Sequence, residues 1–243
     1  MKKYSVSIII PAYNEEKRIK STLESMRKYI DDSGNRWQSV EILVVADGCT
    51  DGTEKLAEKV KHDFLPELKL VAYPDNMGKG FAVRSGVEAS AGDIVLFADA
   101  DGATPIYELD RLSVPIIDGG AEMVIASRRT DDANIVKKQP PHRKFLGNCF
   151  SLAVRTILGI PFLDTQCGFK VFKGDAARDI FKESECSGFA IDIELIYIAM
   201  KKGYRITEMG ISWTDGEDSK VSPLKDGIKM LLFTIKLALT KRK

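Results

Sequence analysis

Short apolar runs alternate regularly with helical patterns over the first half of this chain, and this alternation restricts the possible folds more than any other feature. The runs Ile8–Ile10 and Ile42–Val45 are apolar at successive positions, so both faces of the strands that they form need to be covered. Strands of this kind that alternate with helices are typical of a mostly parallel sheet. We therefore predict an α/β fold with helices on both faces of the sheet.

The same patterns predict the individual elements. The expected strands of the first half are 5–10, 40–46, 68–73, 93–98 and 121–127, and the expected helices are 15–31, 52–64, 79–91 and 105–118. Later segments are read as a long polar loop at 128–144, a mostly apolar segment at 145–163, strands at 169–173 and 204–213, and a helix at 191–202. We expect one large domain over residues 1–222, followed by a C-terminal amphipathic helix over residues 223–243.

Composition and charge argue against several classes of protein. The 243 residues carry 36 basic and 35 acidic side chains, and this balance argues against a nucleic-acid-binding protein. The four cysteines are scattered without a CxxC pair, which is compatible with a reducing cytoplasm. We expect neither a signal peptide nor a membrane-spanning helix, because no apolar segment approaches the required length of about 20 residues.

Two carboxylates, Asp99 and Asp101, directly follow the apolar strand at 93–98. In open α/β sheets, ligands bind at the carboxyl ends of the strands. Carboxylate oxygens suit Mg²⁺ or Mn²⁺ that also holds a diphosphate, because these ions take oxygen ligands and share them with phosphates. An Asp-x-Asp alone also fits a solvated turn, so its neighbours decide the interpretation.

Polar residues follow the other predicted strands too. The first strand leads into Pro11–Glu16, the second into Asp47–Thr53, and the third into Asp75–Gly80, where a lysine between glycines begins a helix. Each segment alone is explained equally well by caps and turns. Their convergence at one sheet edge instead predicts a binding site for a nucleotide and its phosphates.

Together these segments resemble the family 2 inverting glycosyltransferases of the GT-A fold. The matching elements are Pro-Ala-Tyr-Asn-Glu-Glu, Asp-Gly-x-Thr-Asp-Gly-Thr, Asn-x-Gly-Lys-Gly and Asp-x-Asp. The resemblance implies that Asp99 and Asp101 hold the metal, and that the nucleotide-sugar contacts are Pro11, Ala12, Tyr13, Glu15, Asp47, Asn76, Gly78, Lys79, Asp99, Ala100, Asp101, Gln166 and Lys220. Ala46 stands where many members carry a second acid, which leaves the identity of the base open.

The second half of the chain is similar to dolichyl-phosphate β-glucosyltransferases and related polyprenyl-phosphate hexose synthases. The similarity is carried by the segments 97–104, 164–172, 189–195 and 213–220, of which Asp-Thr-Gln-Cys-Gly-Phe-Lys is the most specific. It implies metal-dependent transfer of glucose from UDP-glucose to a polyprenyl phosphate. Two alternatives stay open, namely a mannose synthase that uses GDP-mannose and a family 2 transferase that acts on a saccharide hydroxyl.

The resemblance also implies the residues that act on the acceptor. Arg128 and Arg143 lie where the family uses arginines for the acceptor phosphate, and arginine binds phosphate with two parallel hydrogen bonds. A phosphate acceptor is already anionic and needs no strong base. Asp192 is then expected to contact the donor sugar or orient the acceptor, whereas with a hydroxyl acceptor it becomes the base. Asp101, Arg128, Arg143 and Asp192 are the expected catalytic residues.

An enzyme of this kind has to reach a membrane. The C-terminal helix places Ile228, Leu231, Leu232, Ile235 and Leu239 on one face. This face either lies in a membrane interface or packs on the domain, and the apolar segment 145–163 has the same two interpretations. We expect a peripheral protein on the cytoplasmic face of the membrane. A non-catalytic nucleotide-sugar-binding or lipid-binding protein is the alternative from another class.

Overall fold

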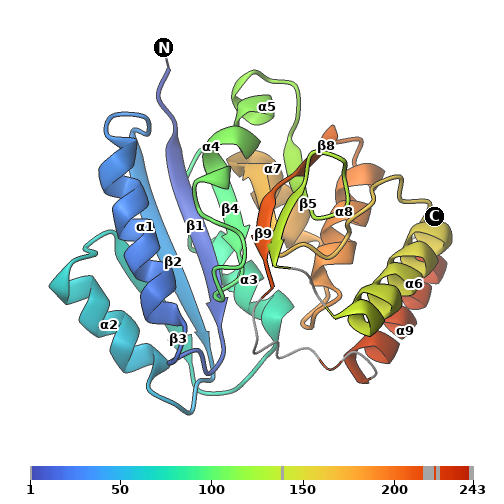
Figure 1. Cartoon of the computed structure of the whole chain (residues 1–243), viewed down its shortest axis with the longest axis horizontal. Helices are drawn as coiled ribbons and strands as arrows, with labels where there is room; N and C mark the ends of the chain where they lie inside the picture. The colour runs from blue at the N-terminus through green and yellow to red at the C-terminus, as the bar shows by residue number, and fades with distance from the viewer. Residues whose placement is uncertain (1, 138–139, 216–221, 223–224, 241–243) are drawn as a thin grey trace.

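A seven-stranded sheet forms the centre of the protein in the computed structural model, which describes residues 2–137, 140–215, 222 and 225–240 (Figure 1). The strand order is β3-β2-β1-β4-β7-β5-β8. The bounds of these strands are β1 (Ser5–Ala12), β2 (Ser39–Asp47), β3 (Leu68–Tyr73), β4 (Ile94–Ala98), β5 (Met123–Ser127), β7 (Phe169–Lys173) and β8 (Ile206–Gly210).

The sheet is mostly parallel, as the alternation of strands and helices predicts. β1 pairs with β2 and β4 in parallel, with Ile8 opposite Ile42 and Leu96. β7 is antiparallel to its two neighbours, β4 and β5. The carboxyl ends of β1, β2, β3 and β4 therefore lie at one edge, and the segment that enters β7 joins them there.

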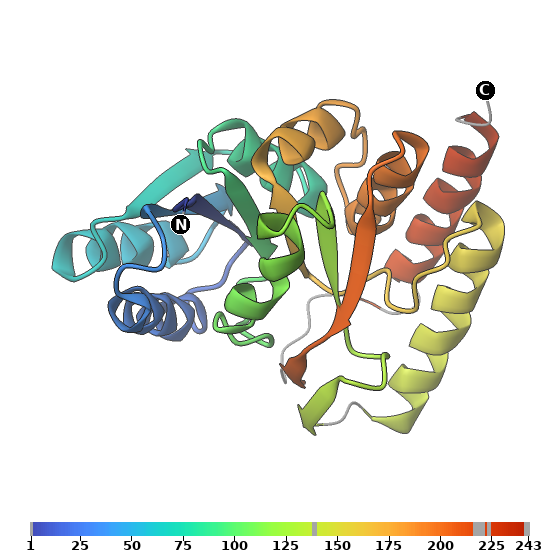
Figure 2. The ribbon, with the colours of Figure 1, turned by 90° about the horizontal axis from the view of Figure 1, so that it is seen from above.

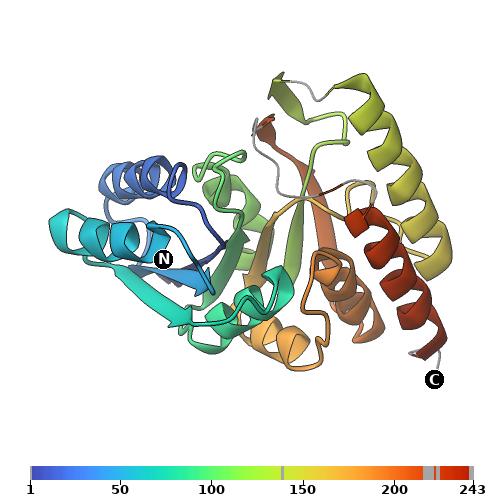
Figure 3. The same cartoon turned by 90° about the horizontal axis from the view of Figure 1, so that it is seen from below.

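Helices cover both faces of the sheet, as Figures 2 and 3 show. Their bounds are α1 (Ile19–Ser33), α2 (Thr53–Asp63), α3 (Lys79–Glu88), α4 (Glu108–Leu112), α5 (Val114–Ile117), α6 (Pro141–Leu158), α7 (Gly174–Lys182), α8 (Ile191–Lys201) and α9 (Lys225–Thr240). Ile8 and Ile10 belong to the core with α1 and α2, whereas Ile9 and Val45 belong to the core with α3 and α8. Alternate residues of the strands thus enter two separate apolar cores.

α6 and α9 run side by side at one end of the molecule (Figure 3). The short parallel strands β6 (Asn134–Lys137) and β9 (Ser212–Thr214) form a second, two-stranded sheet. α9 turns Met230, Thr234, Leu237 and Ala238 inward. None of the helices within the described ranges has the length and hydropathy that crossing a membrane requires.

The structure corrects several of the element boundaries expected from sequence. The polar loop expected at 128–144 contains β6 and the first turn of α6, and the strand expected at 204–213 is divided at Ile211 between two sheets. The helix expected at 105–118 is interrupted at Ser113, just before Pro115. α7 was not expected, although its buried residues Ala176, Ala177, Ile180 and Phe181 follow the spacing of one helix face.

Gly86 allows α3 to pack directly on the sheet. A Cβ atom at this position would overlap the Ile9 side chain and press on Val45. We expect Gly86→Ala to lower the free energy of unfolding by about 1–3 kcal/mol, because the overlap outweighs the helix propensity gained with alanine. Urea denaturation of the wild type and the variant measures this difference.

Gly227 of α9 provides the matched control. A Cβ atom there would meet nothing within 4 Å. Gly227→Ala is expected to leave stability unchanged or to raise it by up to about 1 kcal/mol. Equal losses in the two variants would show that close packing on the sheet is not what requires glycine at position 86.

Candidate active site

A cavity of about 780 Å³ opens at the sheet edge where the strands β1, β2 and β4 end. Its walls come from segments far apart in the sequence, from the end of β1 to the start of α9. A volume of this size suits a small molecule or nucleotide. The parallel strands therefore bring the polar segments that follow them to one site, as open α/β sheets do.

Asp47, at the end of β2, organises one wall of this cavity. Its buried carboxylate accepts hydrogen bonds from the Asn76 side chain (2.9 Å) and from the backbone N–H groups of Met77 (2.7 Å) and Gly78 (2.9 Å). Gly78 has a φ of 95°, and a Cβ there would overlap the Ser187 carbonyl, so only glycine fits at the start of α3. A carboxylate accepts about four hydrogen bonds, so Asp47 can accept one more from a ligand.

Glu15 and Arg18 form a second polar wall, just before α1. The Arg18 guanidinium donates from Nε to Glu15 Oε2 (2.8 Å) and from Nη2 to Oε1 (2.9 Å), a two-pronged pair. The Glu15 backbone N–H donates to the Thr53 hydroxyl at 2.7 Å. Both charged residues line the cavity, with Tyr13 at its exposed rim. This wall therefore offers hydrogen-bonding groups beside an aromatic ring.

Asp99 and Asp101 lie on the floor, in the turn after β4. The Asp99 backbone N–H donates to the Gly168 carbonyl (2.9 Å), and Ala103 N–H donates to Asp101 Oδ1 (3.0 Å). A Cβ at Gly168 would overlap the Asp99 carboxylate, so this glycine leaves room for it. Burial, together with the charges of Asp101 and Asp192, raises the pKa of Asp99 despite the nearby Lys79.

These two carboxylates fit a divalent cation. In the part of the chain that the structure describes, no cluster of three or more His, Cys, Asp or Glu side chains forms a complete metal site. A cation held by Asp99 and Asp101 would need further oxygen ligands. Mg²⁺ is usually bound in this way, by one or two carboxylates together with substrate phosphates. The site therefore fits a cation that arrives with a phosphorylated ligand.

A chain of ion pairs leads from the partly exposed Asp99 across the cavity floor to the buried Asp192 and Lys170. The Lys79 ammonium contacts Asp99 Oδ1 at 2.9 Å and Asp192 Oδ2 at 3.1 Å. The other Asp192 oxygen accepts from Lys170, which is fully buried and also donates to the Cys167 carbonyl (2.6 Å). Burial alone would raise the pKa of Asp192, but the two ammonium groups hold it below its ordinary value. Asp192 is therefore a poor proton acceptor.

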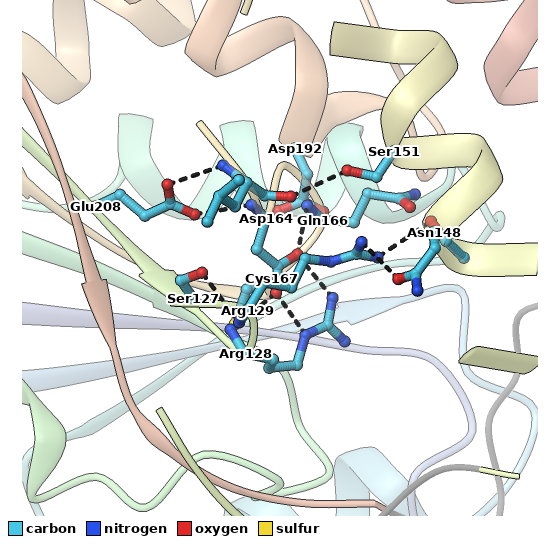
Figure 4. Close-up of polar contacts among 12 residues, drawn as sticks. Ser127, Arg128, Arg129, Asn148, Ser151, Asp164, Gln166, Cys167, Asp192 and Glu208 are labelled. Atoms are coloured by element: carbon cyan, nitrogen blue, oxygen red, sulfur yellow. Dashed lines mark hydrogen bonds and ion pairs between the residues drawn. The ribbon is translucent and has the colours of Figure 1, made fainter. Parts of the chain in front are cut away.

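Arg128, which follows β5, forms a second buried ion pair on the opposite wall (Figure 4). It donates from Nε to Asp164 Oδ2 (2.7 Å) and from Nη2 to Oδ1 (2.9 Å), and its backbone N–H also reaches Oδ2 (3.0 Å). Burial alone would raise the pKa of Asp164, but Arg128 holds it well below its ordinary range. Arg143 of α6 lies 3.8 Å from Asp215 and completes a cationic wall.

All described residues that the sequence predicts for the site line this one cavity. They are Pro11, Ala12, Tyr13, Glu15, Asp47, Asn76, Gly78, Lys79, Asp99, Ala100, Asp101, Arg128, Arg143, Gln166 and Asp192. Lys220, expected to contact the nucleotide sugar, lies outside the described residues.

Sequence reasoning missed several lining residues, notably Arg18, Trp213 and Met230. The spacing of Arg18 three residues after Glu15 is a signal that could have found this pair. Trp213, whose ring centroid lies 5.4 Å from the Arg128 guanidinium, begins the segment in which the sequence emphasised Lys220. Met230 gave no local signal, because a methionine on an amphipathic helix is ordinarily a core residue.

The arrangement indicates the chemistry that this site can perform. Carboxylates that suit a cation lie at one end of the cavity, and arginines that suit an anion lie at the other. Between them, the charges of Lys79 and Asp192 form an ion pair. Burial raises the pKa of the Cys167 thiol to about 12, so this cysteine stays protonated and is a poor nucleophile. The site therefore fits the joining of two bound anionic molecules better than attack by a protein nucleophile.

Comparisons with known sequences agree with this geometry. Residues 7–181 match the family model described as glycosyl transferase family 2. A dolichyl-phosphate beta-glucosyltransferase of Trichomonas vaginalis is 36% identical, over 96% of this chain and 70% of that protein. The Homo sapiens dolichyl-phosphate beta-glucosyltransferase is 32% identical, over 93% of this chain and 72% of that protein.

A solved structure shares the fold. The glucosyl-3-phosphoglycerate synthase of Mycobacterium tuberculosis, in complex with Mn²⁺, uridine-diphosphate-glucose and phosphoglyceric acid, aligns with a TM-score of 0.67. It is 20% identical, and the alignment covers 96% of this chain and 80% of that one. The GT-A fold expected from the sequence is thereby confirmed.

The buried charge chain makes a prediction for Asp192. Asp192→Asn would leave the fully buried Lys170 ammonium without a carboxylate, and an unpaired buried charge is strongly destabilising. We expect the free energy of unfolding to fall by about 3–5 kcal/mol in guanidinium denaturation.

Glu194, two residues further along α8, serves as the matched control. It is equally buried, but it accepts hydrogen bonds only from neutral donors, namely the backbone N–H groups of Glu185 and Cys186 and the Ser184 hydroxyl. Glu194→Gln is therefore expected to cost about 1–2 kcal/mol. Equal losses in the two variants would contradict the importance of the Lys170–Asp192 ion pair.

Proposed function

The chain belongs to glycosyl transferase family 2, and we propose that it transfers glucose from UDP-glucose to a polyprenyl phosphate of the dolichyl type, with inversion at the anomeric carbon. The observation that carries the proposal is a single cavity with an acidic pair at one end and arginines at the other. The relatives named dolichyl-phosphate beta-glucosyltransferase support the choice of donor sugar and acceptor.

The donor occupies the side of the cavity formed by β1, β2 and β4. The nucleoside lies against Tyr13, Glu15 and the remaining acceptor capacity of Asp47. Asp99 and Asp101 hold Mg²⁺ or Mn²⁺, which would stabilise the negative charge that develops on the leaving diphosphate. Lys79, at the start of α3, provides a further cation near the diphosphate.

The state of Asp192 favours a phosphate acceptor over a saccharide hydroxyl. A hydroxyl nucleophile needs a general base, and such a base works best when its pKa lies near the working pH. Asp192 instead has a lowered pKa and both oxygens on lysines. A phosphate monoester carries its negative charge already, and needs only to be positioned by cations such as Arg128 and Arg143.

The acceptor reaches the site from a membrane surface. Of the fourteen large hydrophobic side chains that are exposed among the described residues, seven lie on α6 and α9. They include Phe145 and Leu152 of α6 and Leu232 and Leu239 of α9, each more than 60% exposed. Lys229 and Lys236 are exposed on α9. Apolar side chains flanked by lysines bind anionic bilayers.

The C-terminal helix therefore has two faces with different partners. Met230, Thr234, Leu237 and Ala238 pack on the domain, while the face selected from sequence stays largely exposed. We propose that residues 223–243 form an extension of the glycosyltransferase domain of residues 1–222, and that this extension holds the protein on the cytoplasmic face of a membrane.

The activity is tested with labelled UDP-glucose and a short polyprenyl phosphate. We expect a glucosyl lipid to form with Mg²⁺ or Mn²⁺ and EDTA to abolish its formation, because without the cation the carboxylates of Asp99 and Asp101 would repel the anionic diphosphate. Asp101→Asn is expected to lower the rate by at least about 100-fold. Asp175→Asn, at an exposed carboxylate of α7, is the matched control and should retain full activity.

GDP-mannose is assayed in parallel. Formation of a mannosyl lipid would support a polyprenyl phosphate as the acceptor but would show GDP-mannose to be the donor. Release of UDP with saccharides but without any lipid product would contradict the proposal and would favour the transferase that acts on a hydroxyl.

Membrane contact is tested by flotation with vesicles of phosphatidylcholine and phosphatidylglycerol. We expect the wild type to float with the vesicles, and Leu232→Glu with Leu239→Glu to reduce the bound fraction about tenfold or more, because two apolar contacts become charged. The matched control is Val114→Glu with Ile117→Glu, on exposed apolar positions of α5. Equal losses in both double variants would refute a specific role for α9.

A further inference from the structure

A second cavity of about 310 Å³ opens beside the first, between α6, α9 and the small sheet. The two cavities share Arg128, Arg143 and Trp213. The remaining wall of the smaller cavity includes Arg129 and the apolar side chains of Leu146 and Phe150. Its lining contains four cationic side chains, and no carboxylate of the described residues contributes to it.

Two of these cations have local counter-ions. The guanidinium of Arg128 is paired with both oxygens of the buried Asp164. Arg143 lies 3.8 Å from Asp215. The positive charge of these two arginines is thus largely compensated by the protein itself.

Arg129 has a different environment. Its guanidinium donates from Nη1 to the Asn148 side-chain carbonyl (2.7 Å) and from Nη2 to the Gly147 backbone carbonyl (3.0 Å), both of them neutral. Figure 4 shows it extending toward Asn148 while Arg128 extends toward Asp164. Within the described ranges, Arg129 forms no ion pair. Burial, together with the neighbouring Arg128 and Arg155, lowers the pKa of Arg129, and the charges of Asp164 and Glu208 partly oppose this shift, although arginine remains protonated in proteins.

We propose that Arg129, a half-buried guanidinium that no carboxylate of the described residues contacts, binds the acceptor phosphate. This inference rests on the proposed function, because it assigns one more residue to the same acceptor. Asn148 and the Gly147 carbonyl hold the guanidinium in place before the acceptor binds, so little side-chain entropy is lost on binding. The apolar residues Leu146 and Phe150 lie where the first prenyl units would follow the phosphate.

The physical reason lies in the cost of partial burial. A cation that has lost part of its hydration and has no counter-ion is in an unfavourable state. An arriving phosphate relieves this cost and gains charge-assisted hydrogen bonds, for which a guanidinium has five N–H donors. At Arg128 the phosphate has to compete with the Asp164 carboxylate for the N–H donors of the guanidinium. Arg129 should therefore contribute more to acceptor affinity than its neighbour in sequence.

The test compares Arg129→Gln and Arg129→Lys with the wild type, using citronellyl phosphate as acceptor and UDP-glucose with Mn²⁺. We expect Arg129→Gln to raise the KM for the acceptor about tenfold or more and the KM for UDP-glucose less than about twofold. Arg129→Lys keeps the charge, so its KM for the acceptor should lie between the values for the wild type and Arg129→Gln. Calorimetric titration of citronellyl phosphate into protein loaded with UDP and Mn²⁺ should give the same order of Kd values, with a weaker salt dependence for Arg129→Gln.

Two control variants distinguish a loss of phosphate binding by Arg129 from a general structural effect of substitution. Asn148→Ala removes one hydrogen bond to Arg129 but keeps the cation, and should change the Kd less than about threefold. Arg205→Gln, at an exposed ion pair with Glu122, should leave all constants unchanged. An unchanged Kd in Arg129→Gln, or an equal change in Asn148→Ala, would overturn the inference.

The same assay distinguishes the inference from the proposed function. If the wild type neither binds nor glucosylates citronellyl phosphate, the proposed function fails. If the wild type does both and Arg129→Gln behaves like it, only the role of Arg129 fails.

Discussion

The line of ion pairs from the buried Lys170 and Asp192 through Lys79 to the more exposed Asp99 is the interaction on which the rest of the site depends. These residues come from β7, α8, the start of α3 and the end of β4. Each charge needs an opposite charge beside it, because an unpaired ion in this environment costs several kcal/mol. The four elements therefore have to meet in one arrangement. The carboxylate proposed to hold the cation and the lysine proposed to lie near the diphosphate are positioned by the same ion pairs that stabilise the fold.

This arrangement also explains why the antiparallel strand β7 matters. Inserted between β4 and β5, it places Lys170 opposite Phe97 and the Gly168 carbonyl opposite the Asp99 N–H. The parallel strands β1, β2 and β4 end in groups that suit a nucleotide, whereas the segment before β7 carries Asp164 and Gln166 toward Arg128. The donor half and the acceptor half of the cavity thus meet at the point where the strand direction changes.

The sequence predicts those site residues whose position depends only on their neighbours in the chain. Asp99 and Asp101 follow a buried strand, and Gly78 and Lys79 begin a helix, so their positions at the sheet edge follow from local pattern. The partners of these residues are not local. Lys170 reads as a strand residue, and only Asp192, 22 residues further on, explains how its ammonium is buried. β6 was not predicted, and β9 was expected only as the end of the strand at 204–213, because the pairing that joins Asn134 with Ser212 links segments far apart in the sequence.

The two cavities connect membrane contact to access of the acceptor. α6 and α9 form walls of the smaller cavity with Leu146, Phe150 and Met230, and the same helices carry the exposed apolar side chains. A prenyl chain that stays in a bilayer against these helices would therefore present its phosphate between them, close to Arg129 and Arg143. Binding to the membrane and binding of the phosphate then favour the same placement of the protein, and each lowers the entropic cost of the other. In that placement the phosphate of the lipid would lie close to Arg129, whose guanidinium donates only to neutral carbonyl groups among the described residues.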